Sequence, residues 1–293
     1  MTSGSARLSV LAAAILFSTG GAAIKGTALD SFQVAGFRSG VAAIALLLFL
    51  PAARRGFGLD LLPAAAAYAG TLVCFVTATK LTTSAAAIFL QSTAPIWVLL
   101  LSPWLLREPI RRRDLPYVGL AALGLGLVFW GSRDAAATAP RPELGNVIAL
   151  ASGLFYALLM ITMRRLAREG AERDRSMPAT VMGNALAFAI CLPFALPVEG
   201  ARPADAVAIG YLGVVQIGVA YWLFVRGLRE LSALEVSLLV LIEPVLNPLW
   251  TWWLHGERPG PLAAAGGAVL VVALAARTLL DRAPRAPEAP LPD

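Results

Sequence analysis

The sequence is poor in charge, in histidine and in cysteine. Charged residues fill 14% of the 293 positions, whereas soluble domains carry about a quarter. The one histidine, His255, has no partner for a metal or catalytic site, and Cys74 and Cys191 each fall inside an apolar block, without a CxxC motif or a disulfide pattern. There is also no phosphate-binding loop. We therefore expect no metal, no bound cofactor, no ATP-driven step and no enzymatic activity.

Apolar residues dominate the chain, at 58% of positions and a mean hydropathy of +0.73. They come in blocks of about twenty residues, the length that a helix needs to cross ~30 Å of hydrocarbon. The first block is long enough to span, so we interpret it as an uncleaved helix rather than a signal peptide. The proline-rich segment 281–293 is predicted to be a disordered cytoplasmic tail. The pattern predicts an all-α integral membrane protein with ten transmembrane helices, at about 8–28, 32–51, 61–80, 82–105, 115–131, 143–163, 178–198, 204–226, 231–253 and 260–279.

The cations are distributed unevenly between the connecting segments. If the N-terminus is cytoplasmic, 17 of the 24 Lys and Arg lie on the cytoplasmic side, 5 on the other side and 2, Lys25 and Arg38, within spans. This bias satisfies the positive-inside rule. It predicts a multi-pass protein of the bacterial inner membrane with both termini cytoplasmic. Because topology explains the net charge of +6, no nucleic-acid partner is expected.

The two halves of the chain resemble each other at an offset of 149 residues. Residues 94–108, APIWVLLLSPWLLRE, align with residues 243–257, EPVLNPLWTWWLHGE, so that Pro95 matches Pro244 and Glu108 matches Glu257. Five helices per half is an odd number, so the second half must enter the membrane upside down. We predict a first repeat over 1–142 and an inverted second repeat over 143–280, an arrangement common in secondary transporters.

These features resemble the EamA type of the drug/metabolite transporter superfamily. The resemblance rests on ILFSTGGAAIK from Ile15 to Lys25, on the Phe37–Arg38 pair and on the doubled proline–glutamate segment, and it covers about residues 8–279. Within the superfamily the chain looks most like the YddG-like exporters of aromatic and other amino acids. One departure is Phe17-Ser18, where the family often carries Trp-Gly.

The resemblance implies a basket-like bundle whose central cavity is lined by the first four helices of each half. It also implies a secondary transporter that exports small metabolites, above all amino acids of aromatic or broad range, by alternating access. The expected partners are this small-molecule substrate and the lipid bilayer, and the oligomeric state, a monomer included, stays open. An intramembrane enzyme or a passive channel for small amphiphilic solutes is the alternative.

Ionisable residues within spans are costly, so they normally face a cavity or a partner. Arg38 can pair with Asp30 or act in transport, and Glu243 can carry a proton, pair with Arg38 or a substrate amine, or stay neutral. Lys80 can hold a carboxylate or offset a helix dipole. Pro95 and Pro244 are candidate hinges. The candidate residues of the substrate cavity are Phe17, Ser18, Phe75, Lys80, Gln91, Trp97, Tyr156, Gln216 and Tyr221, whereas the other tryptophans are expected in the interfacial belt.

Overall fold

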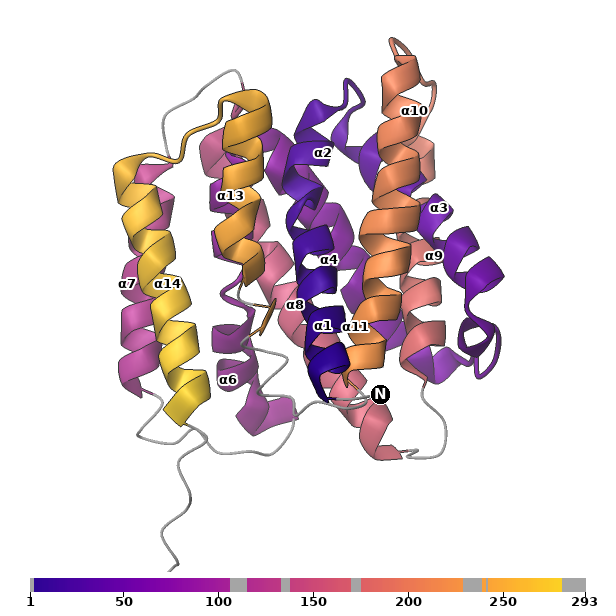
Figure 1. The fold of residues 1–293 in the computed structure, drawn as a ribbon, viewed down its shortest axis with the longest axis horizontal. Helices are drawn as coiled ribbons and strands as arrows, with labels where there is room; N and C mark the ends of the chain where they lie inside the picture. The colour runs from indigo at the N-terminus through magenta and orange to yellow at the C-terminus, as the bar shows by residue number, and fades with distance from the viewer. Residues whose placement is uncertain are drawn as a thin grey trace, which may run out of the picture.

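The computed structural model describes residues 3–105, 115–132, 138–169, 175–228, 239–240 and 242–280, and all regular elements within them are helices (Figure 1). The predicted tail 281–293, Glu108 and part of the predicted span 231–253 lie outside the described residues. The α-helices are α1 (Ser3–Ser18), α2 (Gly20–Gly26), α3 (Ser31–Phe49), α4 (Leu62–Leu81), α5 (Ser84–Gln91), α6 (Ala94–Leu105), α7 (Leu115–Gly131), α8 (Pro142–Glu169), α9 (Ser176–Ala195), α10 (Pro203–Gly210), α11 (Ala220–Leu228), α13 (Ile242–His255) and α14 (Pro261–Leu280).

Six helical segments are long and apolar enough to cross a membrane. They are Gly4–Gly26, Ser31–Phe49, Leu59–Leu81, Pro142–Met163, Ser176–Ala195 and Pro203–Phe224, and each overlaps one of the predicted spans. The other four predicted spans overlap the shorter helices α5 with α6, α7 and α13, and the 20-residue helix α14. The chain is thus a multi-pass membrane protein.

Several of these segments change helical form along their length. Thr19 separates α1 from α2, and Ser92 and Thr93 separate α5 from α6. Between α10 and α11 the chain follows a π-helix over Tyr211–Val219. This form is rare in proteins, and where it occurs it is often at a functional site. Pro95 is the second residue of α6, and Pro244 is the third described residue of α13. Their role as hinges stays a prediction.

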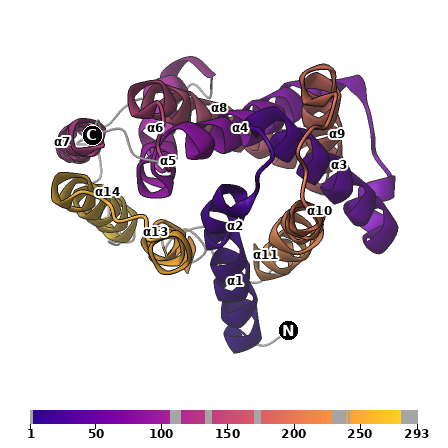
Figure 2. The same cartoon turned by 90° about the horizontal axis from the view of Figure 1, so that it is seen from above.

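Seen from one end, the helices form two facing rows (Figure 2). One row holds α4, α5, α6 and α8, and the other holds α14, α13, α1 with α2, and α10 with α11. The helices α3 and α9 pack together at one end of the rows, and α7 packs on α14 at the other end. The largest buried cluster draws its side chains from both halves of the chain, including Val34, Phe89 and Leu270.

Close packing of the outer helices depends on glycine. A Cβ on Gly124 of α7 would lie 2.9 Å from the carbonyl oxygen of Gly266, and one on Gly266 would lie 2.6 Å from that of Gly124. Both distances are shorter than real contacts, so only glycine lets these two backbones touch. Small residues play this role in membrane helices generally.

Candidate functional site

One end of the bundle is closed by a buried ion pair. Lys25 at the end of α2 lies 3.0 Å (Nζ–Oε2) from Glu257, which follows α13, and their side chains are only 5% and 3% exposed. Lys25 also donates to the carbonyl oxygens of Thr82 (2.7 Å) and Thr138, and Glu257 Oε1 accepts from the backbone N–H of Ser84 (2.6 Å). We call these five residues the latch. Because a buried charge is tolerated only when it is paired, the latch holds α2, α5 and the segment after α13 together.

A second polar contact lies next to the latch. The hydroxyl of Ser84 lies 2.5 Å from Oδ1 of Asn247 on α13. Gly21 on α2 packs against this pair: a Cβ there would overlap the Ser84 hydroxyl and approach Asn247 Oδ1 to 2.6 Å. Glycine at position 21 is therefore needed for α2, α5 and α13 to meet at this end.

The connection between α2 and α3 is fixed by charged side chains at the same end. Lys80 Nζ donates to both the carbonyl and the hydroxyl oxygen of Thr27, each at 2.8 Å. Asp205 Oδ1 accepts from the N–H of Ala28 (2.9 Å) and from Arg202 Nη2 (3.0 Å). The Asp205 carboxylate raises the pKa of Arg202, because its hydrogen bonds favour the charged guanidinium. This end, drawn at the top of Figure 1 and opposite to the N-terminus, is thus tied together by a polar network.

An aromatic cluster lies deeper in the bundle. The ring of Tyr221 on α11 lies 5.3 Å from that of Phe17 on α1, 5.8 Å from Tyr68 on α4 and 6.4 Å from Phe224. Offset and edge-on contacts at these distances are favourable for aromatic pairs. The cluster joins three helices that come from opposite halves of the chain, and Phe17 and Tyr221 were among the predicted cavity residues.

Two charged residues flank the aromatic cluster. Arg38 on α3 is 2% exposed and lies within electrostatic reach of Tyr68, Tyr221 and Cys191. Glu243 on α13 is half-buried and lies within electrostatic reach of Tyr156 and Tyr221. Tyr221 is therefore within electrostatic reach of one basic and one acidic side chain. No ion pair joins these two residues to each other or to another described side chain.

Arg38 is enclosed, and two of its three guanidinium nitrogens lack hydrogen-bond partners among the described residues. Neither its Nε nor its Nη1 has a partner within the described ranges. Asp30, the partner considered from the sequence, instead caps α3 by accepting from the N–H of Gln33 (2.9 Å). Nearby polar atoms also have spare capacity: the Tyr68 hydroxyl approaches Tyr221 and Asn184 without hydrogen-bond geometry, and Asn184 Oδ1 is likewise unpaired.

Two other predicted residues, Ser18 and Gln216, form side-chain hydrogen bonds near the cluster. Ser18 Oγ donates to the carbonyl of Ile15 (2.7 Å) and accepts from Trp250 Nε1 (2.9 Å). Gln216, in the π-helix, donates from Nε2 to the carbonyl of Phe17 (3.3 Å), while its Oε1 has no partner in the described part of the chain. These contacts place Ser18 and Gln216 at the junction of α1 with α13 and with the π-helix.

The remaining predicted residues lie elsewhere. Gln91 at the end of α5 donates to Ser152 Oγ on α8 (2.7 Å), and Trp97 on α6 is half-buried. Phe75 is 8% exposed and belongs to the main hydrophobic core. Lys80 belongs to the closed end already described. The structure thus brings Phe17, Tyr156 and Tyr221 together with the two charged residues, and does not bring all the candidates into one place.

Four residues that the sequence did not single out for the site are Glu257, Tyr68, Asn184 and Trp250. Glu257 had a signal, because it is the repeat partner of Glu108 and follows a membrane helix. Tyr68 is the one large polar residue in the small-residue stretch AAAAYAG. Trp250 was assigned to the interfacial belt by its position near a span end, but its indole nitrogen bonds across to α1. Nothing in the sequence marks Asn184 as a site residue, except that it is an amide in an apolar helix.

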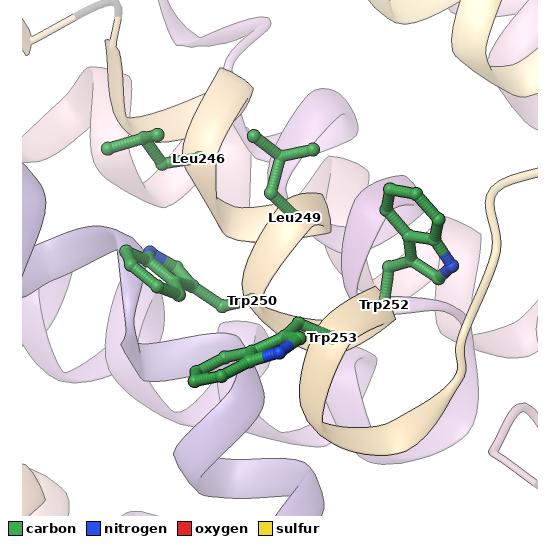
Figure 3. A pocket seen from close by; sticks show the side chains of 5 residues that line it. All are labelled: Leu246, Leu249, Trp250, Trp252 and Trp253. Carbon is green, nitrogen blue, oxygen red and sulfur yellow. The ribbon is translucent and has the colours of Figure 1, made fainter.

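A groove of about 520 Å³ runs along α13, lined by Leu246, Leu249, Trp250, Trp252 and Trp253 (Figure 3). The side chains of Trp252 and Trp253 are 49% and 76% exposed. A second groove, of about 450 Å³, lies between α3 and the π-helix with α11 and is lined by apolar residues.

Apolar helices long enough to span, with a buried ion pair and a buried arginine among them, define a membrane protein with a polar interior. Such an interior is typical of proteins that move solutes. The chain belongs to the EamA-like transporter family, whose model matches residues 4–130 and, a second time, residues 143–277. It is therefore a membrane transporter.

Two relatives of the chain are also described as transporters. An uncharacterized transporter of Archaeoglobus fulgidus is 29% identical over 203 residues, which are 69% of this chain and 69% of that protein. The uncharacterized transporter YxxF of Bacillus subtilis (strain 168) is 26% identical over 201 residues, 67% of this chain and 61% of that protein. A crystal structure at 22% identity superposes with a TM-score of 0.63, covering 95% of this chain and 98% of that chain. That likeness concerns the fold alone.

Proposed function

We propose that the chain is a secondary transporter that exports small metabolites, above all amino acids, by alternating access. It would do so in the bacterial inner membrane as ten spans, arranged as two inverted five-helix repeats over 1–142 and 143–280. The observation that carries this proposal is the latch, a buried ion pair closing one end of a bundle whose interior holds Arg38, Glu243 and the aromatic cluster. An alternating-access carrier needs such a closed end, and needs it to be reversible.

The packing of the helices supports the repeat. Under the 149-residue offset, α3 corresponds to α9 and α7 to α14, and the members of each pair pack on each other. The contact of α4 with α8 has its counterpart in that of α11 with α1, and the contact of α6 with α8 has its counterpart in that of α13 with α1. Two copies related by an in-plane two-fold axis would produce these matched contacts. The two separate matches to one family model point the same way.

The distribution of Lys and Arg indicates how the proposed transporter is oriented in the membrane. Because the positive-inside rule puts the N-terminus in the cytoplasm, the latch lies at the outer face and the interior would load from the cytoplasm. Opening requires Lys25 and Glu257 to separate, and water then solvates both charges. The ion pair is therefore suited to a gate, since its cost of separation falls when the end is wet.

The interior supports amino acids as the substrate class. Phe17, Tyr221 and Phe224 offer ring faces and edges to an apolar or aromatic side chain. Arg38 and Glu243 offer one charge of each sign beside the same rings. This composition agrees with the resemblance to YddG-like exporters of aromatic amino acids.

The test is uptake by purified protein in liposomes. A panel of labelled amino acids, nucleosides and organic cations would be offered with and without a pH gradient, with empty vesicles as the control. We expect saturable uptake of one or more amino acids. A failure of every solute to enter faster than into empty vesicles would overturn the proposal, and flux that never saturates would assign a channel instead.

A further inference from the structure

We propose that Arg38 binds the carboxylate of the substrate, beside Tyr68 and Tyr221. This inference rests on the proposed function and deepens it, because it names the group that the interior recognises. The sequence alone left two roles for Arg38, structural pairing and a part in transport.

The state of Arg38 is unusual for a structural arginine. A guanidinium keeps its charge at every physiological pH and presents five N–H donors in a rigid fork. Buried structural arginines satisfy these donors with carboxylates or carbonyls, because an unpaired buried charge costs several kcal/mol. Here the side chain is 2% exposed, and Nε and Nη1 have no partner among the residues described. A structural role leaves this unexplained.

The groups around Arg38 are neutral and have unused hydrogen-bonding capacity. Its electrostatic neighbours are two phenols and the thiol of Cys191, none of which replaces a carboxylate as an ion-pair partner. The Tyr68 hydroxyl and Asn184 Oδ1 are also without partners in the described part of the chain. A ligand carboxylate would take one edge of the guanidinium in a bidentate pair and accept the Tyr68 O–H, which would satisfy the hydroxyl and two of the guanidinium nitrogens.

The backbone next to Arg38 is held in place by the π-helix. A Cβ on Gly213 would lie 2.8 Å from the carbonyl oxygen of Arg38, so the π-helix touches α3 at the turn that carries the arginine. Gln216, three residues further along the π-helix, has an Oε1 without a partner among the described residues. Phe17 and Phe224 both contact the ring of Tyr221. The ligand class is therefore a carboxylate that carries an apolar or aromatic side chain.

Equilibrium binding of labelled L-phenylalanine to the purified protein tests this assignment. The competitors are 3-phenylpropionate, which keeps the carboxylate and lacks the amine, and L-phenylalaninamide, which keeps the amine and lacks the carboxylate. We expect 3-phenylpropionate to displace the label and the amide to displace it at least tenfold less well. Equal displacement by the two compounds, or no binding of L-phenylalanine, would overturn the inference.

Variants of Arg38 separate recognition from folding. We expect Arg38→Gln to weaken L-phenylalanine binding by about 30-fold or more, the effect of truncating one partner of a buried charge pair, and to abolish the preference for 3-phenylpropionate over the amide. Arg38→Lys, which keeps the charge without the guanidinium fork, should bind L-phenylalanine more weakly than the wild type and more tightly than Arg38→Gln. If the role of Arg38 were structural, Arg38→Gln would instead weaken the binding of both competitors equally. If Arg38→Gln does not fold, the Lys variant and the wild-type competition decide the matter.

The matched control is Arg258→Gln, which removes an exposed cation lying over the Trp252 ring (5.7 Å to its centroid). It should bind L-phenylalanine like the wild type. The uptake panel keeps this inference separate from the proposed function: uptake of organic cations but of no carboxylate would leave a transporter and remove the role of Arg38. No uptake of any solute would remove both.

Discussion

Replacing Glu257 by Gln should open the latch end of the transporter. Gln has nearly the same shape and can still accept from the N–H of Ser84, so the change removes the charge and little else. Lys25 would then remain 5% exposed, with only the carbonyl oxygens of Thr82 and Thr138 as partners. Loss of the Glu257 charge raises the free energy of the closed state only, because in the open state water solvates the Lys25 ammonium.

The size of the effect follows from burial. Removing one partner of a buried ion pair costs about 3–5 kcal/mol, and the two carbonyl partners of Lys25 place this case at the low end. A cost of about 3 kcal/mol raises the ratio of open to closed molecules about 150-fold. The double variant Lys25→Met with Glu257→Gln leaves no buried charge, so we expect it to return to within about tenfold of the parent.

Accessibility of a cysteine at Phe17 measures this change. In a background with Cys74 and Cys191 replaced by Ala, Phe17→Cys would report how fast a membrane-impermeant maleimide reaches the aromatic cluster from the latch side. Labelling should accelerate strongly in Glu257→Gln. The control is Arg175→Gln, which breaks an exposed pair with Asp60 and should not change the rate. Unchanged labelling in Glu257→Gln, or a double variant labelled as fast as the single one, would refute the reasoning.

Three further predictions concern other described residues. Gly21→Ala should also accelerate labelling at the latch side, because the added Cβ overlaps the Ser84 hydroxyl, whereas Gly119→Ala, with nothing within 4 Å, should not; equal rates would contradict the packing argument. Glu243→Gln should abolish any dependence of uptake on the pH gradient, and unchanged coupling would remove this carboxyl from the mechanism. Trp250→Phe should lower stability by about 1 kcal/mol, the value of one hydrogen bond, seen as a lower unfolding temperature in detergent; an unchanged temperature would mean that its bond to α1 contributes nothing.

The positions of the membrane segments could be predicted because hydrocarbon imposes a simple rule. Long apolar runs such as 143–163 and 178–198 have no stable alternative to a spanning helix, and the structure has helices there. The interruptions were harder to predict. The sequence YLGVVQIGV carries no signal that distinguishes a π-helix from an α-helix, since the difference of one residue per turn depends on the packing of the π-helix against α3.

The ion pairs could not be assigned from the sequence for a different reason. Lys25 and Glu257 lie more than 230 positions apart, and their pairing depends on how α2, α5 and α13 meet. Arg38 was placed within a span, which identified it as a costly residue, but its expected partner Asp30 is used to cap its own helix. The local rule, a capping box that ends in Gln33, took precedence over the longer contact.

The most direct test of the central claim is solute counterflow in liposomes that contain the purified protein. Vesicles loaded with unlabelled L-phenylalanine and diluted into a trace of the labelled compound should accumulate label above its external concentration for a time, because a carrier that exposes one site alternately exchanges the two pools. Labelled solute that only approaches the external concentration, with no transient excess over it, would contradict alternating access.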